Sequence, residues 1–309
     1  MKTTPYHVIA LLVITVWGTT FVATTLLLHN GLSPRDIFFF RFLLAYIGIW
    51  FFGPRRLFAN NLKDEFLLML IGITGGSLYF MAGNTALGIT QASNVALLAC
   101  TAPVLTIIIS RLFLKKESPA ESQETPDQSG AASPVRRLKK NRFLWQGSFL
   151  ALIGVALVIF NGQVILQVNP LGDMFGLLAA FSWALYTILL KRLSTRYSML
   201  FITRKTFFYG LLTLLPLFLY RPLNVNTVLL MHPVIRGNFL YLGLMASLFC
   251  YFLWNIVVKK LGAVRANNYV YLSPIITMAA SALILNETIT IMAIIGAMLI
   301  LLGVALAER

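Results

Sequence analysis

Long hydrophobic runs, separated by short polar segments, occupy most of this 309-residue chain. Each run holds about as many residues as a helix needs to cross a bilayer, roughly 20. The pattern therefore predicts an all-α integral membrane protein of ten transmembrane helices, joined mostly by short antiparallel turns. The runs fall at 6–28, 36–53, 66–87, 91–114, 143–162, 172–190, 198–219, 238–258, 266–285 and 289–307.

Composition agrees with this pattern, because 58% of the residues are hydrophobic and only 11% are charged. A soluble domain carries about 25% charged residues. The net charge of +15 would also fit a nucleic-acid-binding protein. Here the basic residues lie between the apolar runs, where they act as topology signals, so we expect no nucleic-acid partner. Cys100 and Cys250 fall inside apolar runs, so no disulfide framework is predicted.

Lysine and arginine are distributed very unequally between the two sets of loops. If the N-terminus is cytoplasmic, nineteen of them fall on the cytoplasmic side and three on the outer side. The excess of basic residues marks the cytoplasmic side, so both termini are predicted to be cytoplasmic. The first run, after Lys2, is too long for a signal peptide and has a counterpart in the second half, so we expect it to be retained.

One long polar segment, 115–141, interrupts the series of runs and ends in the basic cluster Arg136–Lys140. Its proline, serine and glutamate content is too high for it to fold alone. We interpret it as a flexible cytoplasmic linker with a positive-inside anchor. A regulatory or anionic-lipid-binding patch is the alternative interpretation.

The two halves of the chain, 1–167 and 168–309, share a series of similar positions in the same order, which indicates an internal repeat. Each half contains an odd number of runs, so the halves must cross the membrane in opposite senses. Inverted repeats place a substrate site near the midplane and suit alternating access. The matched positions are Trp17 with Trp183, Arg41 with Arg204, Asn84 with Asn255, Pro103 with Pro274, Glu117 with Glu287, and the segments 152–157 with 301–306.

Several short motifs resemble the EamA-type branch of the drug/metabolite transporter superfamily. They are Trp17–Phe21, Arg41–Ala45, Ala92–Leu98 with Pro103, Gly172–Asp173, Ser182–Ala184, Trp254–Asn255, Leu261–Ala263, Pro274 and Glu287. The resemblance covers nearly the whole chain except 115–141. It implies a ten-helix exporter or facilitator of amino acids and related metabolites, and it marks architecture better than substrate.

Aromatic residues and prolines at mid-depth are the candidates for lining a substrate cavity. Indole N–H groups at that depth need a hydrogen-bond partner, and a proline inside a span frees a backbone carbonyl. Packing alone is the alternative role for each of them. The candidates are Trp17, Thr20, Tyr79, Pro103, Trp183, Tyr186, Tyr251 and Pro274.

Other polar residues within the runs are candidates for gates or intramembrane charges. Asn84 and Asn255, with Trp254, occupy symmetric positions near opposite ends of two spans, where they either gate the pathway or join helices statically. Arg41 and Arg204 lie one or two turns inside opposite membrane faces. Charged groups in spans are functional candidates, although the heads of long side chains near helix ends also reach the headgroups.

These features predict a transporter of small metabolites, expected to be amino acids or related compounds, in a bacterial-type inner membrane. A lipid-linked-sugar carrier of the same fold is the main alternative, and an intramembrane enzyme a remote one. We expect no cofactor or metal, because no histidine or cysteine pair has metal-ligand spacing. A channel would show charged rings or a repeated filter loop, and neither is found. The oligomeric state is left open, and a monomer is compatible with the sequence.

All ten acidic residues lie outside the deep parts of the predicted spans. A carrier driven by protons or sodium usually keeps a carboxylate or histidine near its midplane. Asp173, at the outer entrance of the sixth span, comes nearest. The sequence therefore favours facilitated diffusion, driven by the gradient of the substrate itself.

Overall fold

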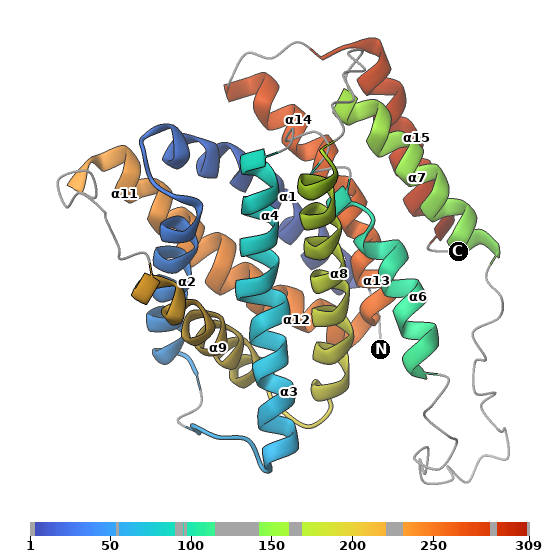
Figure 1. Ribbon diagram of the computed structural model, residues 1–309. Helices are drawn as coiled ribbons and strands as arrows, with labels where there is room; N and C mark the ends of the chain where they lie inside the picture. Colours follow the sequence, from blue (N-terminus) through green and yellow to red (C-terminus); the bar gives the residue numbers. More distant parts are fainter. Residues whose placement is uncertain are drawn as a thin grey trace, which may run out of the picture.

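The structure, a computed structural model, describes residues 4–53, 56–89, 95, 98–114, 142–160, 169–220, 231–284 and 289–307, and every regular element among them is helical (Figure 1). In the first half these are α1 (Thr4–His29), α2 (Pro34–Trp50), α3 (Leu62–Gly72), η1 (Ile73–Ser77), α4 (Leu78–Ile89), α6 (Ala102–Leu114) and α7 (Arg142–Phe160). In the second half they are α8 (Pro170–Leu193), α9 (Met199–Tyr220), α11 (Pro233–Leu240), η3 (Tyr241–Phe249), α12 (Cys250–Leu261), α13 (Ala263–Asn268), η4 (Tyr269–Leu272), α14 (Ser273–Ile284) and α15 (Ile291–Ala307). The linker 115–141 lies outside the described residues.

Four of these helices are long and apolar enough to cross a membrane, namely Leu62–Ala86, Pro170–Leu193, Met199–Leu219 and Pro233–Leu261. Shorter apolar stretches occur at Thr4–Thr20, Phe143–Val158 and Ile291–Ala307. The all-helical class predicted from the sequence is confirmed for the described residues. Ten membrane crossings and the orientation of the termini stay predictions.

Local sequence explains where several helices begin. Ser33, Asn61 and Asn169 precede α2, α3 and α8, and each side chain accepts a hydrogen bond from a backbone N–H of the first turn. Such caps satisfy donors that the helix itself leaves free. Pro34 and Pro170 then occupy the first helical position, where the missing N–H costs nothing.

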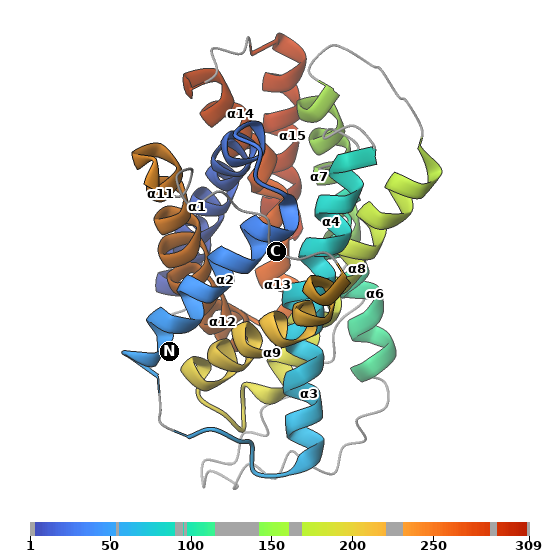
Figure 2. The same cartoon turned by 60° about the vertical axis from the view of Figure 1, so that its left-hand side comes forward.

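Two of the continuous helical stretches in the bundle contain a wider, π-helical segment in the middle. In the first, η1 joins α3 to α4, and in the second, η3 joins α11 to α12 (Figures 1 and 2). Wide turns of this kind are frequent at functional sites. They also change which backbone carbonyls point out of the helix. The two wide segments occupy equivalent places in the two halves of the chain.

In the fourth and ninth predicted spans, the regular α-helix begins just before a proline. Pro103 is the second residue of α6, and Pro274 is the second residue of α14. The turn Thr101 N–H to Leu98 carbonyl (3.0 Å) precedes α6, and the 3-10 segment η4 precedes α14. Proline starts a helix easily because its φ is already helical. The fourth predicted span therefore contains a turn before α6, whereas the ninth stays helical through η4 into α14.

The ends of the helices meet at two faces. At one, which we call the basic face, the α8–α9 turn lies against the start of α3, and Lys191 at the end of α8 donates to the Lys259 carbonyl at the end of α12 (2.6 Å). At the other, the opposite face, Asn84 of α4 donates to the Pro34 carbonyl (3.3 Å), and Asn169 donates to the Ile89 carbonyl (2.7 Å). The sequence prediction places the basic face in the cytoplasm.

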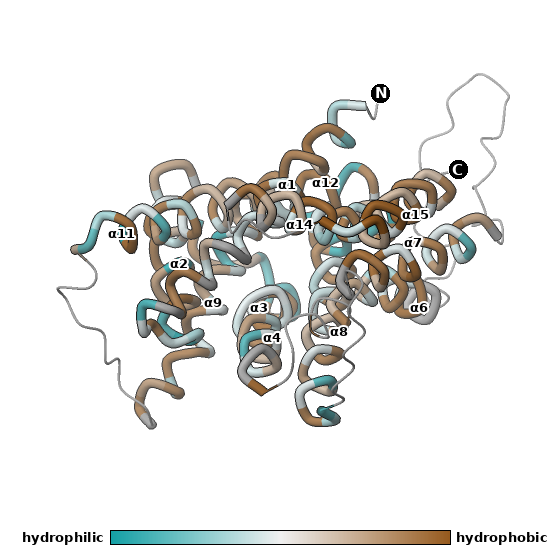
Figure 3. Tube along the Cα trace, turned by 90° about the horizontal axis from the view of Figure 1, so that it is seen from above, coloured by the Kyte–Doolittle hydropathy of each residue, from teal (hydrophilic) through white to brown (hydrophobic). Residues whose placement is uncertain are grey.

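Helices α7 and α15 pack side by side at one edge of the bundle, and hydrophobic residues cover α15 along its length (Figures 1 and 3). Glycines stand at their contact: a Cβ on Gly154 would lie 2.5 Å from the Gly296 carbonyl oxygen, and one on Gly147 would lie 2.4 Å from that of Gly303. Small residues let two membrane helices approach closely. Because 147 meets 303 and 154 meets 296, the two helices run antiparallel.

Candidate functional site

An aromatic cluster lies where α1, α4, α8 and α12 meet, near the middle of the bundle. Trp17 is at its centre, with ring centroids 5.4 Å from Trp183, 5.7 Å from Tyr251 and 5.2 Å from Trp254. Tyr79 lies 5.2 Å from the Trp183 ring and Tyr186 lies 5.0 Å from it. Tilted and edge-to-face pairs at these distances attract beyond their buried area. The tertiary structure thus brings together five of the predicted cavity residues and Trp254; we call these six residues the aromatic cluster.

The wide helical segments supply polar partners to two residues of this cluster, Trp17 and Tyr251. Trp17 Nε1 donates to the Ala246 carbonyl of η3 (2.9 Å), and the Tyr251 hydroxyl donates to the Gly75 carbonyl of η1 (2.8 Å). Ser182 Oγ donates to the neighbouring Thr74 carbonyl (2.8 Å). Each bond joins one half of the chain to the other. The π-helical carbonyls are therefore satisfied by side chains from the opposite half.

Close packing around Gly75 holds the buried side of the cluster. A Cβ at Gly75 would lie 2.3 Å from the Tyr186 ring, so only glycine leaves room for it. The Tyr186 hydroxyl donates to Asn255 Oδ1 (2.6 Å), and Asn255 Nδ2 donates to Thr203 Oγ1 (2.7 Å). Asn255 is fully buried and joins α12 to both α8 and α9. The structure thus gives this residue helix-joining hydrogen bonds at the centre of three helices.

Sequence reasoning missed Asn267, which lies in α13 just before the 3-10 segment η4. Its Oδ1 accepts a hydrogen bond from Trp183 Nε1 (3.2 Å), and its Nδ2 donates to Thr106 (2.5 Å) and Thr187 (3.2 Å). It is fully buried. A polar residue within an apolar run was the available signal, but Asn267 and Asn268 are adjacent and both fully buried, and the sequence does not say which one bonds to Trp183.

The two sides of the aromatic cluster differ in exposure. Trp183, Tyr186, Tyr251 and Trp254 are buried, whereas Trp17, Thr20, Tyr79 and Asn84 are half-buried. Toward the basic face the neighbouring core is closed, since Val13, Ile14, Leu190, Leu193, Val257 and Val258 are at most 1% exposed. The accessible surface of these central residues therefore belongs mainly to Trp17, Thr20, Tyr79 and Asn84.

The remaining predicted residues lie around this centre. Thr20 donates to the carbonyl of Trp17 within its own helix (2.6 Å). Pro103 is buried one turn before Thr106, and Pro274 is buried one turn before Thr277, whose hydroxyl donates to the Gly18 carbonyl (2.9 Å). Each proline thus lies at the start of a helix whose next turn carries a threonine that hydrogen-bonds to another helix, Thr106 to Asn267 and Thr277 to Gly18.

The two intramembrane arginines have different surroundings. Arg204 donates to the Arg56 carbonyl at the basic face, and its guanidinium lies 4.8 Å from the Trp50 ring centroid. Arg41 reaches into the bundle, where its Nε donates to Ser247 Oγ (2.9 Å) and its guanidinium lies 4.7 Å from the Phe80 ring centroid. The sequence repeat matches the two positions, but only Arg41 lies beside the centre.

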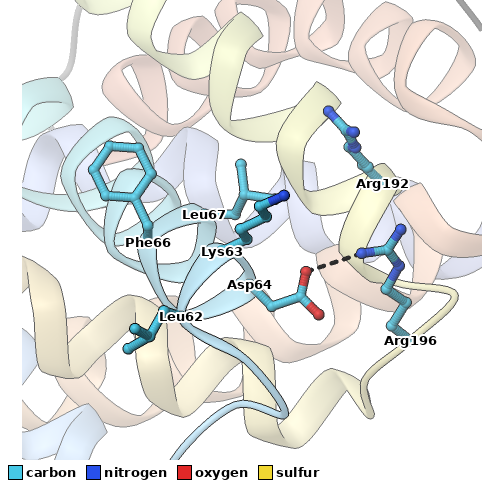
Figure 4. A pocket seen from close by; sticks show the side chains of 7 residues that line it. All are labelled: Leu62, Lys63, Asp64, Phe66, Leu67, Arg192 and Arg196. Atoms are coloured by element: carbon cyan, nitrogen blue, oxygen red, sulfur yellow. Dashed lines mark hydrogen bonds and ion pairs between the residues drawn. The ribbon is translucent and has the colours of Figure 1, made fainter.

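Ion pairs join the two halves at the basic face, and the sequence did not reveal them. Asp64 at the start of α3 accepts hydrogen bonds from Arg196 Nη1 (2.9 Å) and the Tyr197 hydroxyl (2.8 Å), next to a shallow hollow that Arg192 and Lys63 also line (Figure 4). Burial and the Asp64 carboxylate raise the pKa of Tyr197, so its phenol remains a donor. The next residue, Glu65, accepts hydrogen bonds from Lys205 and Tyr209 of α9. We call these six residues the basic-face latch: Asp64, Glu65, Arg196, Tyr197, Lys205 and Tyr209.

Comparison with known proteins shows which protein family the chain belongs to. The sequence profile of the EamA-like transporter family matches residues 4–123 and again residues 170–308. The chain belongs to the EamA-like transporter family. As a member it is a multi-pass membrane transporter, and the family resemblance inferred from its motifs is confirmed.

Relatives of this EamA-like transporter extend over nearly the whole chain. An uncharacterized transporter of Archaeoglobus fulgidus is 26% identical over 97% of this chain and 96% of its own length. A protein of Escherichia coli K12 named a probable amino-acid metabolite efflux pump is 26% identical, covering 96% of this chain and 92% of its own. A solved crystal structure aligns with a TM-score of 0.72 over 99% of this chain and 97% of that one at 17% identity, which shows a shared fold.

Proposed function

We propose that this EamA-like transporter moves small metabolites, amino acids or related compounds, through a path between two inverted five-helix halves, 1–167 and 168–309. The aromatic cluster between the halves would form the midplane substrate site. The observation that carries this proposal is the reciprocal bonding at the cluster, where Trp17 bonds to η3 of the second half while Ser182 and Tyr251 bond to η1 of the first.

Packing between the halves supports a two-fold relation. Helix α1 packs against α12 and α14, and its counterpart α8 packs against α4 and α6. Helix α2 packs against η3, and its counterpart α9 packs against η1. The family profile also matches each half separately. Inverted halves of this kind rock against each other around a fixed midplane site.

The exposure pattern supports a path that is closed at the basic face. The basic-face latch ties α3 to the α8–α9 turn and α9, while Trp17, Thr20 and Tyr79 keep accessible surface. In the proposed cycle, the latch bonds break when the path opens to the basic face. The predicted orientation places that face in the cytoplasm of a bacterial-type inner membrane.

The residues that would contact the substrate are mostly aromatic. Indole and phenol rings offer apolar surface and π-faces, which bind apolar bodies and ammonium groups. The efflux pump name of the Escherichia coli relative supports amino-acid metabolites. Passive transport remains the expectation, since the described carboxylates Asp36, Asp64, Glu65 and Asp173 all lie in the first turns of their helices.

The test is a transport screen in proteoliposomes against amino acids, nucleobases and polyprenyl-phosphate sugars, with proton and sodium gradients imposed separately. Trp17→Phe and Trp183→Phe keep a ring but lose the indole N–H. We expect each to lower transport several-fold, while Trp145→Phe on the exposed side of α7 leaves it unchanged. Transport of lipid-linked sugars alone would favour the flippase alternative, and uphill uptake driven by either gradient would contradict passive transport.

A further inference from the structure

Arg41 is a charged side chain buried in the membrane-spanning part of the fold. It lies seven residues after the first residue of α2, and only 6% of the residue is exposed. Its Nε donates to Ser247 Oγ on η3, and Phe80 of α4 lies under the guanidinium. The guanidinium therefore sits between three helices, α2, η3 and α4.

Three of the four acidic residues that the structure describes are engaged elsewhere, and the fourth, Asp173, lies in the first turn of α8. Asp36 bonds to Ser33 and Arg35, Asp64 to Arg196, and Glu65 to Lys205. No ion pair of Arg41 occurs among the residues that the structure describes. A guanidinium has five N–H donors, and Ser247 accepts from one of them. Because a charge in a span is costly to bury, such a group needs a further role or partner.

The position of Arg41 connects it with the aromatic cluster. Phe80, which lies under the guanidinium, has its ring centroid 5.0 Å from that of Tyr79, and the Tyr79 ring lies 5.2 Å from Trp183. Tyr79 and Phe80 are both half-buried. A cation and a set of accessible rings are thus adjacent within one region of the bundle.

We propose that Arg41 binds the carboxylate of the transported substrate, while the aromatic cluster packs against the rest of the molecule. This assignment rests on the proposed function and makes the substrate class more specific: a small carboxylate-bearing compound with an apolar body. An arginine fork matches two carboxylate oxygens in a bidentate pair. One cation suits a single negative charge, so a carboxylate fits better than a doubly charged phosphate ester or phosphonate.

Arg204 provides a matched control for this proposal. It is the repeat counterpart of Arg41, is similarly buried, and lies at the basic face, where the Arg56 carbonyl and Trp50 surround it. A general requirement for a buried arginine would affect both positions. A carboxylate site would depend on Arg41 alone.

The experiment compares L-leucine, L-leucinamide and the phosphonate analogue of leucine as substrates in proteoliposomes at zero membrane potential. We expect the wild-type protein to prefer leucine over the amide by about tenfold in KM. Arg41→Gln should bring this ratio near one while amide transport persists, Arg41→Lys should keep part of the preference, and Arg204→Gln should leave it unchanged.

Other outcomes would overturn the assignment. A wild-type protein that transports leucine and its amide equally, or an Arg41→Gln protein that loses both in proportion, would show that Arg41 only holds the helices. Preference for the phosphonate would identify a different anion. If Arg41→Gln does not fold, the leucine-to-leucinamide KM ratio of Arg41→Lys decides. A ratio equal to that of the wild-type protein, although an ammonium has replaced the guanidinium, would contradict the proposal. Absence of all transport in the wild-type screen would instead contradict the proposed function.

Discussion

Single polar side chains determine how the interior of this transporter is held together. Asn255 and Asn84 are equivalent in the sequence repeat, yet their surroundings differ. Asn255 is fully buried and makes two hydrogen bonds, to Tyr186 and Thr203, whereas Asn84 is half-buried and makes one longer bond, to the Pro34 carbonyl. A buried polar group that loses its partner costs more than an accessible one, which water can satisfy.

The first prediction therefore concerns these two asparagines. Asn255→Ala should lower the stability of the folded protein by about 1–3 kcal/mol, because Tyr186 and Thr203 lose their partner inside the bundle. Asn84→Ala should cost clearly less, about 0.6 kcal/mol as for an average interhelical hydrogen bond in a membrane protein. Thermal unfolding in detergent, followed by intrinsic fluorescence, measures the stability of both variants. Equal losses of stability would contradict the expectation that the more buried asparagine contributes more.

Elements of this fold depart from regular helices at places that matter for the site. The wide segments η1 and η3 release the carbonyls of Thr74, Gly75 and Ala246 for side chains of the opposite half. The turn before α6 and the 3-10 segment before α14 place Thr106 and Thr277 one turn inside the helices that follow. Irregular backbone at membrane depth persists only where such partners satisfy it.

The second prediction concerns the contact of α7 with α15. Gly154→Ala should destabilise the protein by roughly 1–3 kcal/mol, because the new methyl group would meet the Gly296 carbonyl at 2.5 Å and the Ile300 nitrogen at 2.7 Å, and backbone atoms move only with the helices. Gly237→Ala in α11 is the control, since nothing lies within 4 Å of its position. It should be neutral or slightly stabilising, as alanine favours helix. A Gly154→Ala protein as stable as the wild type would mean that α7 and α15 lie farther apart.

At the scale of the whole molecule, the two faces differ in whether ion pairs join the halves. Charged pairs between the halves hold the basic face, where Asp64 bonds to Arg196 and Glu65 to Lys205. At the opposite face Asp36 pairs with its own neighbour Arg35, so that pair does not join the halves. The charges therefore favour a molecule closed at the basic face.

The third prediction tests this latch. Asp64→Asn combined with Glu65→Gln should increase labelling of a cysteine at Val257, buried near the basic face, by a thiol reagent applied from that side. We expect an increase of about three- to tenfold, since pairs near a surface contribute about 1 kcal/mol or less each. The background carries Cys100→Ala and Cys250→Ala. Asp36→Asn is the control, and unchanged labelling in the double variant would contradict the latch.

The fourth prediction concerns orientation in the membrane. Single cysteines at Thr195, in the α8–α9 turn, and at Asn30, in the α1–α2 turn, are exposed at opposite faces. An impermeant thiol reagent added to intact cells should label the Asn30→Cys protein and spare Thr195→Cys until the membrane is permeabilised. Labelling of both in intact cells would contradict the predicted topology.

Hydrophobic patterning by itself determined the class of this protein and the positions of its helices. Each apolar run is helical over most of the residues that the structure describes, because helices satisfy every backbone group within the segment. The motifs determined the family, and the spacing of tryptophans, tyrosines and asparagines identified most residues of the centre. These features depend on residues close in sequence or on composition, so a single chain reveals them.

Only the tertiary structure decided which of these residues contact each other. Trp17 and Ala246 are 229 positions apart, Asp64 and Arg196 are 132 apart, and Trp183 and Asn267 are 84 apart. Long apolar helices present suitable faces to many neighbours, so sequence does not select among them. The choice follows from shape: glycines allow close approach, wide turns release carbonyls, and buried side chains such as Trp183 and Tyr186 bond to partners on other helices.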